Sequence, residues 1–194
     1  MDNLGIGPNP LFDASAPRTN MWRQPLGVPQ HSVLTMRVTL PEVLAYARRY
    51  DANRLHHDAA HARAQGVARG VSLPGTMIAA VAVRLVQSPE HSEGAVSHRH
   101  VLLAGRTDER LRRPCFPDEV FRTESVKVAQ RLASKGGRGI MTFRVGMFDE
   151  AGEEVYTVTN TMIASLDPAD LEHTPAENAP AAKPQAQQAQ ASRL

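Results

Sequence analysis

One run that is apolar on every side of a helix constrains the fold of this chain more than any other segment. Residues 74–86 have the sequence PGTMIAAVAVRLV, and Arg84 is the only charged residue among them. A helix that is apolar around its whole circumference has to be buried. The run is much shorter than the roughly 20 apolar residues that cross a bilayer. We therefore expect a helix enclosed by protein, and no membrane association.

Alternating segments after this run predict the sheet that encloses the helix. They occupy 97–105, 119–133, 137–149 and 153–166, and they are rich in β-branched residues. The short segments SKGGRG and DEAG between the last three predict hairpins. Two segments show apolar residues at even spacing, which would share one strand face: Val120, Val126, Val128 and Leu132 in the second, and Met141, Phe143, Val145 and Met147 in the third.

The segments before the apolar run predict one further strand and two helices. SVLTMRVTL, at 32–40, alternates as a strand does, and Pro41 followed by Glu42 is a typical helix start. HDAAHARAQG predicts a short second helix that ends at Gly66. A buried helix followed by long antiparallel strands predicts an α+β fold whose sheet wraps around that helix.

Composition divides the chain into an arm, one domain and a tail. Residues 1–31 are rich in Pro, Gly and Asn, so we expect an irregular arm that Trp22 or Phe12 orders against the domain. Residues 32–168 hold the predicted elements. Residues 169–194 carry no Phe, Trp or Tyr, and after Leu171 their one large branched apolar side chain is the last residue, Leu194, so we expect disorder there.

Charge and cysteine content exclude several classes of protein. A net charge of +2 without an aromatic basic stripe argues against a nucleic-acid binder. The single cysteine, Cys115, excludes an internal disulfide framework and fits a reducing cytoplasm. We expect no secretory signal, since the first residues lack a basic start followed by an apolar run.

The segment YDANRLH contains the most reactive pair of side chains. Asp51 and His56 stand five positions apart with Asn53 between them. An acid and an imidazole at this spacing can be an acid/base pair around a substrate, or a helix cap with a surface histidine. His57 and His61, four apart on the second helix, could present two imidazoles to a metal, but no third ligand is evident and a solvated face is the simpler interpretation.

The order of these segments and the motif from Tyr50 to His56 resemble the MaoC-like, (R)-specific enoyl-CoA hydratase family. The motif of that family runs approximately Gly-Asp-x-Asn-Pro-Leu-His, and Tyr50 and Arg54 replace its glycine and proline here. Pro74-Gly75 stands where the family often has His-Gly, and RPCFPDEV resembles a later family pattern. The resemblance covers roughly residues 33–166. It implies a single hot-dog domain, with a long antiparallel sheet around a central helix.

The resemblance also implies a reaction, the reversible hydration of 2-enoyl thioesters. Asp51 would be the principal base for water, and His56 would orient that water and share the proton transfers. The backbone N–H of Gly75, at the start of the buried helix, would stabilise the enolate oxygen. Asn53 would hold the loop or the substrate. The remaining residues expected around the substrate are Tyr50, Arg54, Pro74 and Thr76.

The same resemblance implies no organic cofactor and no metal, because the thioester itself makes the α-proton labile. The acyl group would arrive on coenzyme A or on an acyl carrier protein. Arg112 and Arg113 would contact the carrier's phosphates, or they form a solvated face. A homodimer or higher oligomer is expected, since a lone domain would expose an apolar sheet edge.

Two alternatives to hydration stay open at the level of sequence. A hot-dog domain could instead hydrolyse the thioester or add another nucleophile to the enoyl group, because one fold hosts several chemistries. It could also bind an acyl chain without any reaction. Cys115 is interpreted as a small packed residue and not as a nucleophile.

Overall fold

The computed structural model describes residues 21–32, 34–86, 101–134 and 136–171. The predictions for residues 1–20, 97–100 and 172–194 fall outside these ranges. The helices are α1 (Leu40–Tyr50), the 3-10 turn η1 (Arg54–His56), α2 (Ala59–Ala64), α3 (Gly75–Val86) and α4 (Pro168–Leu171). The strands are β1 (Pro29–His31), β2 (Met36–Arg37), β3 (Val101–Leu111), β4 (Val120–Leu132), β5 (Arg138–Phe148) and β6 (Glu154–Ser165).

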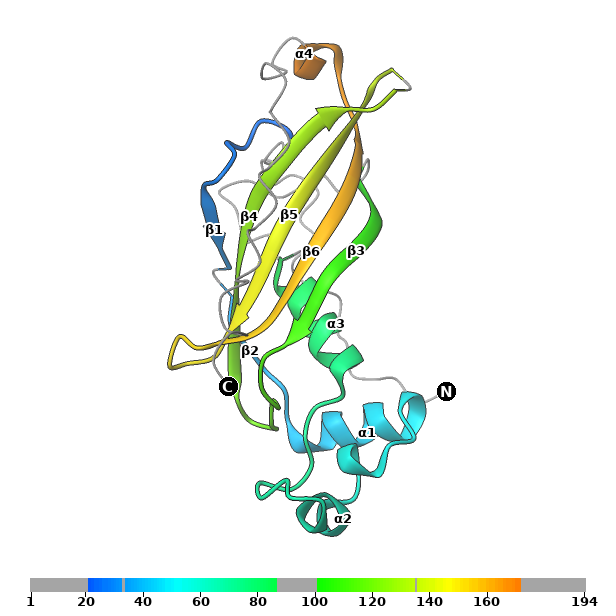
Figure 1. Cartoon of the computed structure of the whole chain (residues 1–194), viewed down its shortest axis with the longest axis vertical. Helices are drawn as coiled ribbons and strands as arrows, with labels where there is room; N and C mark the ends of the chain where they lie inside the picture. Colours follow the sequence, from blue (N-terminus) through cyan, green and yellow to red (C-terminus); the bar gives the residue numbers. More distant parts are fainter. Residues whose placement is uncertain (1–20, 33, 87–100, 135, 172–194) are drawn as a thin grey trace, which may run out of the picture.

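One antiparallel sheet runs the length of the molecule (Figure 1). Its strand order is β1-β4-β5-β6-β3, and β2 also pairs with β4. Hairpins join β4 to β5 and β5 to β6, as the SKGGRG and DEAG segments predict. Helix α3 lies against one face of the sheet, while α1 and α2 gather at one end of it (Figure 1). The predicted α+β architecture, a sheet around one apolar helix, is confirmed.

Helix α3 is buried because its apolar side chains pack into the main core. Ile78, Ala82 and Leu85 are at most 2% exposed, and they cluster with side chains from α1 and from strands β4, β5 and β6. The alternation in β5 is also confirmed, since its even-spaced apolar face is buried throughout. Within the described residues, no helix has both the length and the apolar character that crossing a membrane requires.

Strand β4 buries the face opposite to the predicted one. The predicted face, Val120, Val126, Val128 and Leu132, is partly or fully exposed. The buried face instead carries Phe121, Thr123, Ser125 and Lys127. A polar side chain can be buried on this face because the N-terminal segment supplies hydrogen-bond partners: Lys127 Nζ, for example, donates to the Met21 and Trp22 carbonyls at 3.0 and 2.8 Å. The even spacing of the valines predicted the wrong face, because hydrogen-bond partners from distant parts of the chain allow polar side chains to be buried.

In the described part of the N-terminal arm, residues 21–28 form turns and irregular backbone, and the last three residues, β1, join the sheet. β1 pairs with β4, which gives these backbone groups regular partners. Trp22 is 2% exposed, as expected for a residue that orders the arm, and its indole N–H donates to the Asp170 carbonyl. Arg23 forms an ion pair with the Asp170 carboxylate at 2.7 Å. Contacts across almost the whole chain therefore fix the arm, and no local pattern could indicate them.

The segment before α1 is mostly not a strand. β2 contains only Met36–Arg37, although strand character was predicted across 32–40. Thr39 and Glu42 form a capping box in which the Glu42 carboxylate accepts from the Thr39 N–H at 2.7 Å. That local pair begins α1 at Leu40 and so ends the extended segment early.

Candidate active site

The motif segment folds through hydrogen bonds between its own residues. The Asn53 N–H donates to Asp51 Oδ1 at 3.0 Å, and Asn53 Oδ1 accepts from the Leu55 N–H at 3.1 Å. The His56 N–H then donates to the Asn53 carbonyl at 3.0 Å. Side chains that bond backbone two positions ahead are typical of Asp and Asn in turns. The turn fixes one oxygen of the Asp51 carboxylate and brings His56 back toward the other.

The imidazole of His56 is oriented by a residue far along the chain. Its Nδ1 lies 2.9 Å from the Ser72 carbonyl oxygen and 3.3 Å from Ser72 Oγ. A carbonyl only accepts, so Nδ1 carries the proton and donates, which leaves Nε2 with its lone pair. Nε2 lies 3.8 Å from Asp51 Oδ2. No sequence pattern indicates Ser72, because the contact depends on the fold.

The gap between Asp51 and His56 suits a shared water molecule. At 3.8 Å the two atoms are too far apart for a direct hydrogen bond. One water can lie within hydrogen-bond distance of both, as polar groups at such separations often arrange. The side chains of His56 and Asp51 are 14% and 27% exposed, so the pair is partly buried yet reachable.

The start of α3 offers two free backbone donors. The N–H groups of Met77 and Ile78 both donate to the Pro74 carbonyl. Those of Gly75 and Thr76 have no acceptor within the described part of the chain, as the geometry of a helix start requires. Gly75 is exposed, and a Cβ added to it would meet nothing within 4 Å. The site therefore has room for a group to approach these amides, which carry the positive end of the helix dipole.

One backbone bond connects the segment before α3 to the motif segment, and a second connects it to the segment before β4. The Ser72 N–H donates to the Leu55 carbonyl at 3.3 Å, and the Leu73 N–H donates to the Cys115 carbonyl at 2.8 Å. Pro74 follows directly and is buried. The segment that orients His56 thus leads into Gly75 within three residues.

Tyr50 and Arg54, which were expected to contact the substrate, have partners of their own. Tyr50 is 63% exposed, and its ring centroid lies 5.1 Å from that of Tyr46. Arg54 pairs with Asp58 at 2.6 Å. The backbone N–H of His61 and the Arg54 guanidinium together lower the pKa of Asp58 to about 2. Thr76 is exposed beside Gly75. The substrate roles of these residues remain predictions.

Two arginines were expected to contact the phosphates of the acyl carrier, and Arg113 is the one that its ion pairs hold more strongly. It reaches Asp149 at 2.6 Å and Glu119 at 3.1 Å. Arg112 is 45% exposed and pairs with Glu154 at 3.5 Å. Arg112 is thus the freer of the two to meet a phosphate, and that role too remains a prediction.

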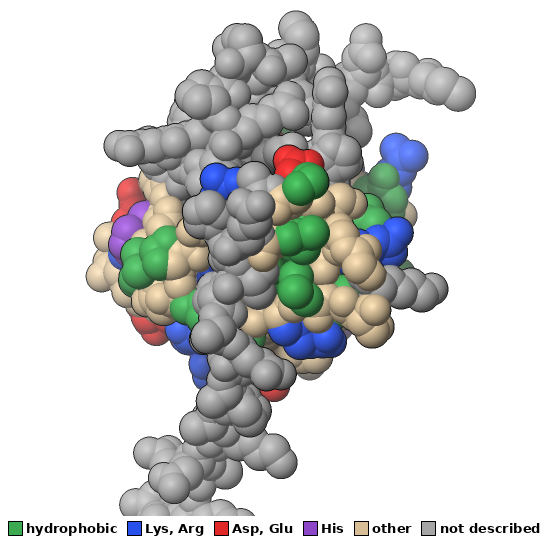
Figure 2. Space-filling model, turned by 90° about the horizontal axis from the view of Figure 1, so that it is seen from above, with side chains coloured by type: hydrophobic (Ala, Val, Ile, Leu, Met, Phe, Trp, Pro, Cys, Tyr) green, Lys and Arg blue, Asp and Glu red, His purple; other side chains and the backbone are tan. Residues whose placement is uncertain are grey.

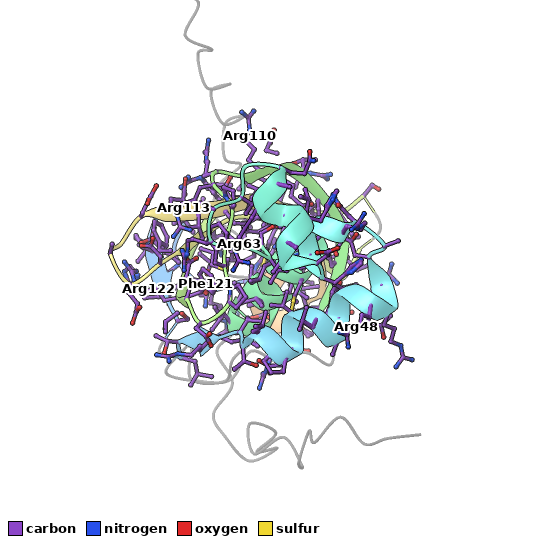
Figure 3. All side chains as sticks on the ribbon, turned by 90° about the horizontal axis from the view of Figure 1, so that it is seen from below. Arg48, Arg63, Arg110, Arg113, Phe121 and Arg122 are labelled. Atoms are coloured by element: carbon purple, nitrogen blue, oxygen red, sulfur yellow. The ribbon has the colours of Figure 1, made fainter. Side chains whose placement is uncertain are left out.

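A cavity of about 350 Å³ lies near α1 and α2, but the Asp51–His56 pair does not line it. Its lining includes His57, Phe116 and Arg63, and Arg63 lies near the centre of this end of the molecule in Figure 3. Among the described residues, Asp51 and His56 are linked through Ser72 to the free amides at the start of α3. In the described ranges, no three His, Cys, Asp or Glu side chains are grouped as metal ligands.

The fold is shared with known hydratases and dehydratases. A MaoC-like dehydratase from Rhodospirillum rubrum superposes with a TM-score of 0.65 and 22% identity, over 75% of this chain and 95% of that one. An (R)-hydratase from A. caviae, involved in PHA biosynthesis, superposes with a TM-score of 0.55 and 21% identity, over 75% of this chain and 98% of that one. A (3R)-hydroxyacyl-ACP dehydratase complex from Mycobacterium tuberculosis superposes with a TM-score of 0.56 and 13% identity, over 71% of this chain and 95% of that one. No family model matches the sequence, and no curated protein matches it.

These similarities define the class of fold. The domain is a hot-dog domain of the type found in MaoC-like dehydratases and (R)-hydratases, as the resemblance in sequence predicted.

Proposed function

We propose that this chain catalyses the reversible hydration of 2-enoyl thioesters, or the dehydration of 3-hydroxyacyl thioesters. One observation carries the proposal: Asp51 Oδ2 lies 3.8 Å from His56 Nε2, and the Ser72 carbonyl fixes the tautomer of the histidine. The similarity in fold to known hydratases supports it.

In the proposed reaction, water sits between the carboxylate and the imidazole. Asp51 takes a proton from the water while the water oxygen forms a bond to the β-carbon. A proton is then delivered to the α-carbon through Asp51 and His56. Negative charge develops on the thioester oxygen, and the Gly75 N–H at the start of α3 stabilises it. No redox step occurs, and the atoms of water end up on the two carbons of the former double bond.

The substitution Asp51→Asn tests the proposal. It keeps the acceptor for the Asn53 N–H but removes the base, so hydration of crotonyl-CoA should fall by roughly 10²- to 10⁴-fold. Asp118→Asn is the matched control, because Asp118 is an exposed aspartate at φ 67°, a conformation that Asn tolerates. Loss of enoyl absorbance and release of free thiol are followed together. Equal rates in wild type and Asp51→Asn would refute the role of the carboxylate.

The same assay separates the two alternative functions. Thiol release without loss of the enoyl group would identify a thioesterase. Binding of acyl thioesters without turnover of any substrate would identify a binding protein.

We further propose that two copies associate along β3. The strand order leaves β3 at an edge, and its Leu102 and Leu103 are 72% and 50% exposed. Figure 2 shows that hydrophobic side chains are also exposed elsewhere on the surface. The first four residues of β3 are apolar, and an edge with exposed apolar side chains favours pairing with another strand. Coenzyme A and an acyl carrier protein remain the two proposed carriers.

A further inference from the structure

A second, smaller cavity lies between the C-terminal half of α3 and the sheet. It measures about 50 Å³, more than the space one water needs. Ala82, Val83 and Val86 line it from the helix, and Met162 lines it from β6. Most of this lining is apolar, yet two polar side chains also face the cavity. These are Arg106 on β3 and Asn160 on β6.

Each of these two side chains has a buried polar atom without a partner. Arg106 Nε is a donor and Asn160 Oδ1 is an acceptor, and neither has a hydrogen bond within the described residues. The two residues are direct cross-strand partners, and both line this cavity. Burying a polar group without a hydrogen bond is costly, and native structures do it rarely. A donor and an acceptor left together in one cavity indicate a missing group that bonds to both.

The rest of the Arg106 side chain is firmly held, so the orientation of Nε is built in. Arg106 Nη2 donates to Tyr156 Oη at 2.8 Å, and the Tyr156 hydroxyl donates to Glu109 Oε1 at 2.7 Å. Tyr156 is 2% exposed, and its burial raises the pKa of the phenol, which keeps it a donor. The Nη2 atom of the guanidinium is therefore held by the tyrosine hydroxyl, while Nε remains available to a group in the cavity.

A hydroxyl group is the simplest group that satisfies both atoms. Its oxygen accepts from Arg106 Nε–H, and its hydrogen is donated to Asn160 Oδ1. A ketone oxygen satisfies only the arginine, and a methyl group satisfies neither. The apolar side chains around the pair fit the hydrocarbon that carries the hydroxyl.

The surface of α3 links this cavity to the proposed active site. Thr76 and Ala80 are exposed and Val83 is half-buried, and at this spacing the three follow one side of the helix. From Gly75 to Val83 the helix rises by about 12 Å. An extended chain advances roughly 1.2 Å per bond, so about ten bonds span that distance.

We propose that Arg106 and Asn160 recognise a hydroxyl group on the distal part of the acyl chain, about ten bonds from the thioester carbonyl. The preferred substrates are then long enoyl thioesters with a hydroxyl near the far end. This inference rests on the proposed hydratase function for the position of the thioester at Gly75.

The test compares three enoyl-CoA substrates of equal length, about twelve carbons, that end in a hydroxymethyl, a methyl ketone or a methyl group. For the wild-type protein, kcat/KM should be roughly ten- to hundredfold higher for the hydroxyl than for the methyl substrate, with the ketone between them. Asn160→Leu should abolish most of this preference. Asn160→Thr, which suits a strand but is shorter, should reduce it even if the leucine variant folds poorly. Val86→Ala is the control: it alters the same cavity without removing a polar group, so the hydroxyl-to-methyl ratio should persist.

Equal kcat/KM for the hydroxyl and methyl substrates would overturn the inference, because Arg106 and Asn160 would then bond only to water. A preference that survives in both Asn160 variants, or a ketone preferred over the hydroxyl, would overturn it as well. Calorimetry with the corresponding saturated thioesters separates this inference from the proposed function. If no enoyl substrate is turned over but the hydroxylated thioester binds at least tenfold more tightly, the recognition site stands and the hydratase proposal fails. If the thioesters bind equally, the inference fails whatever the enzyme activity.

Discussion

Raising the pH from about 8 to about 9 should stabilise this protein, because Lys127 is buried in the folded state. The residue is 2% exposed, and its ammonium group donates to the Met21 and Trp22 carbonyls and to the Gln130 side chain. Burial lowers the pKa of Lys127 from 10.5 to about 8, since the charged form loses hydration. The folded state thus releases this proton at a lower pH than the unfolded state does. Stability rises with pH wherever the unfolded state binds more protons.

The size of the effect follows from the two pKa values. Each pKa unit corresponds to 1.36 kcal/mol, so the charged lysine costs about 3 kcal/mol at neutral pH, and about 1 kcal/mol of this is recovered between pH 8 and 9. These are upper bounds, because the three acceptor oxygens favour the ammonium form. Burial raises the pKa of Cys115 from 9.0 to about 12. The unfolded protein therefore loses this thiol proton at a lower pH than the folded protein, so Cys115 lowers the stability as the pH rises above about 9.

Urea unfolding of wild type and Lys127→Met at about pH 7, 8 and 9 measures the effect. The difference in unfolding free energy between the two proteins should grow toward higher pH in favour of wild type. Contributions from Cys115 are present in both proteins and cancel in the difference. A difference that stays constant across the three pH values would show that the buried lysine titrates normally, and the reasoning from burial would be refuted.

Two further predictions concern packing. Gly139→Ala should destabilise the fold by about 1–3 kcal/mol, because the new Cβ would lie 2.2 Å from Trp22 Cζ3. Thermal melting with tryptophan fluorescence measures this, and Gly136→Ala, where a Cβ meets nothing within 4 Å, should melt like wild type. The thiol of Cys115 is fully buried, and its pKa of about 12 keeps it protonated near pH 8. It should react with a disulfide reagent only after unfolding, so fast labelling of the native protein at that pH would contradict the burial.

Local chemistry explains which features could be predicted from the sequence. The apolar character of α3 and the alternation in β5 are properties of contiguous residues, and both elements form where they were expected. The turn that holds Asp51 is equally local, since Asn53 supplies both a donor and an acceptor within it. The match to a family motif pointed to Asp51 and His56 because the motif is contiguous.

Features that depend on distant partners could not be predicted. Strand β4 alternates valines, but it buries the other face, where residues before α1 accept hydrogen bonds from the Lys127 side chain. Ser72 orients His56 from sixteen positions away. Arg106 and Asn160 meet only because β3 pairs with β6, and nothing in either segment indicates a shared cavity.

Near neighbours in the chain were enough to predict that an antiparallel sheet would enclose an apolar helix and that an acid and an imidazole would share one turn. Hydrophobic periodicity and short-range hydrogen bonds act between such neighbours, and these can be identified directly in the sequence. The tautomer of His56, the buried face of β4 and the unpaired atoms beside α3 follow instead from contacts between distant residues. Each of these depends on which remote groups come within about 3 Å of one another, and folding alone sets that distance.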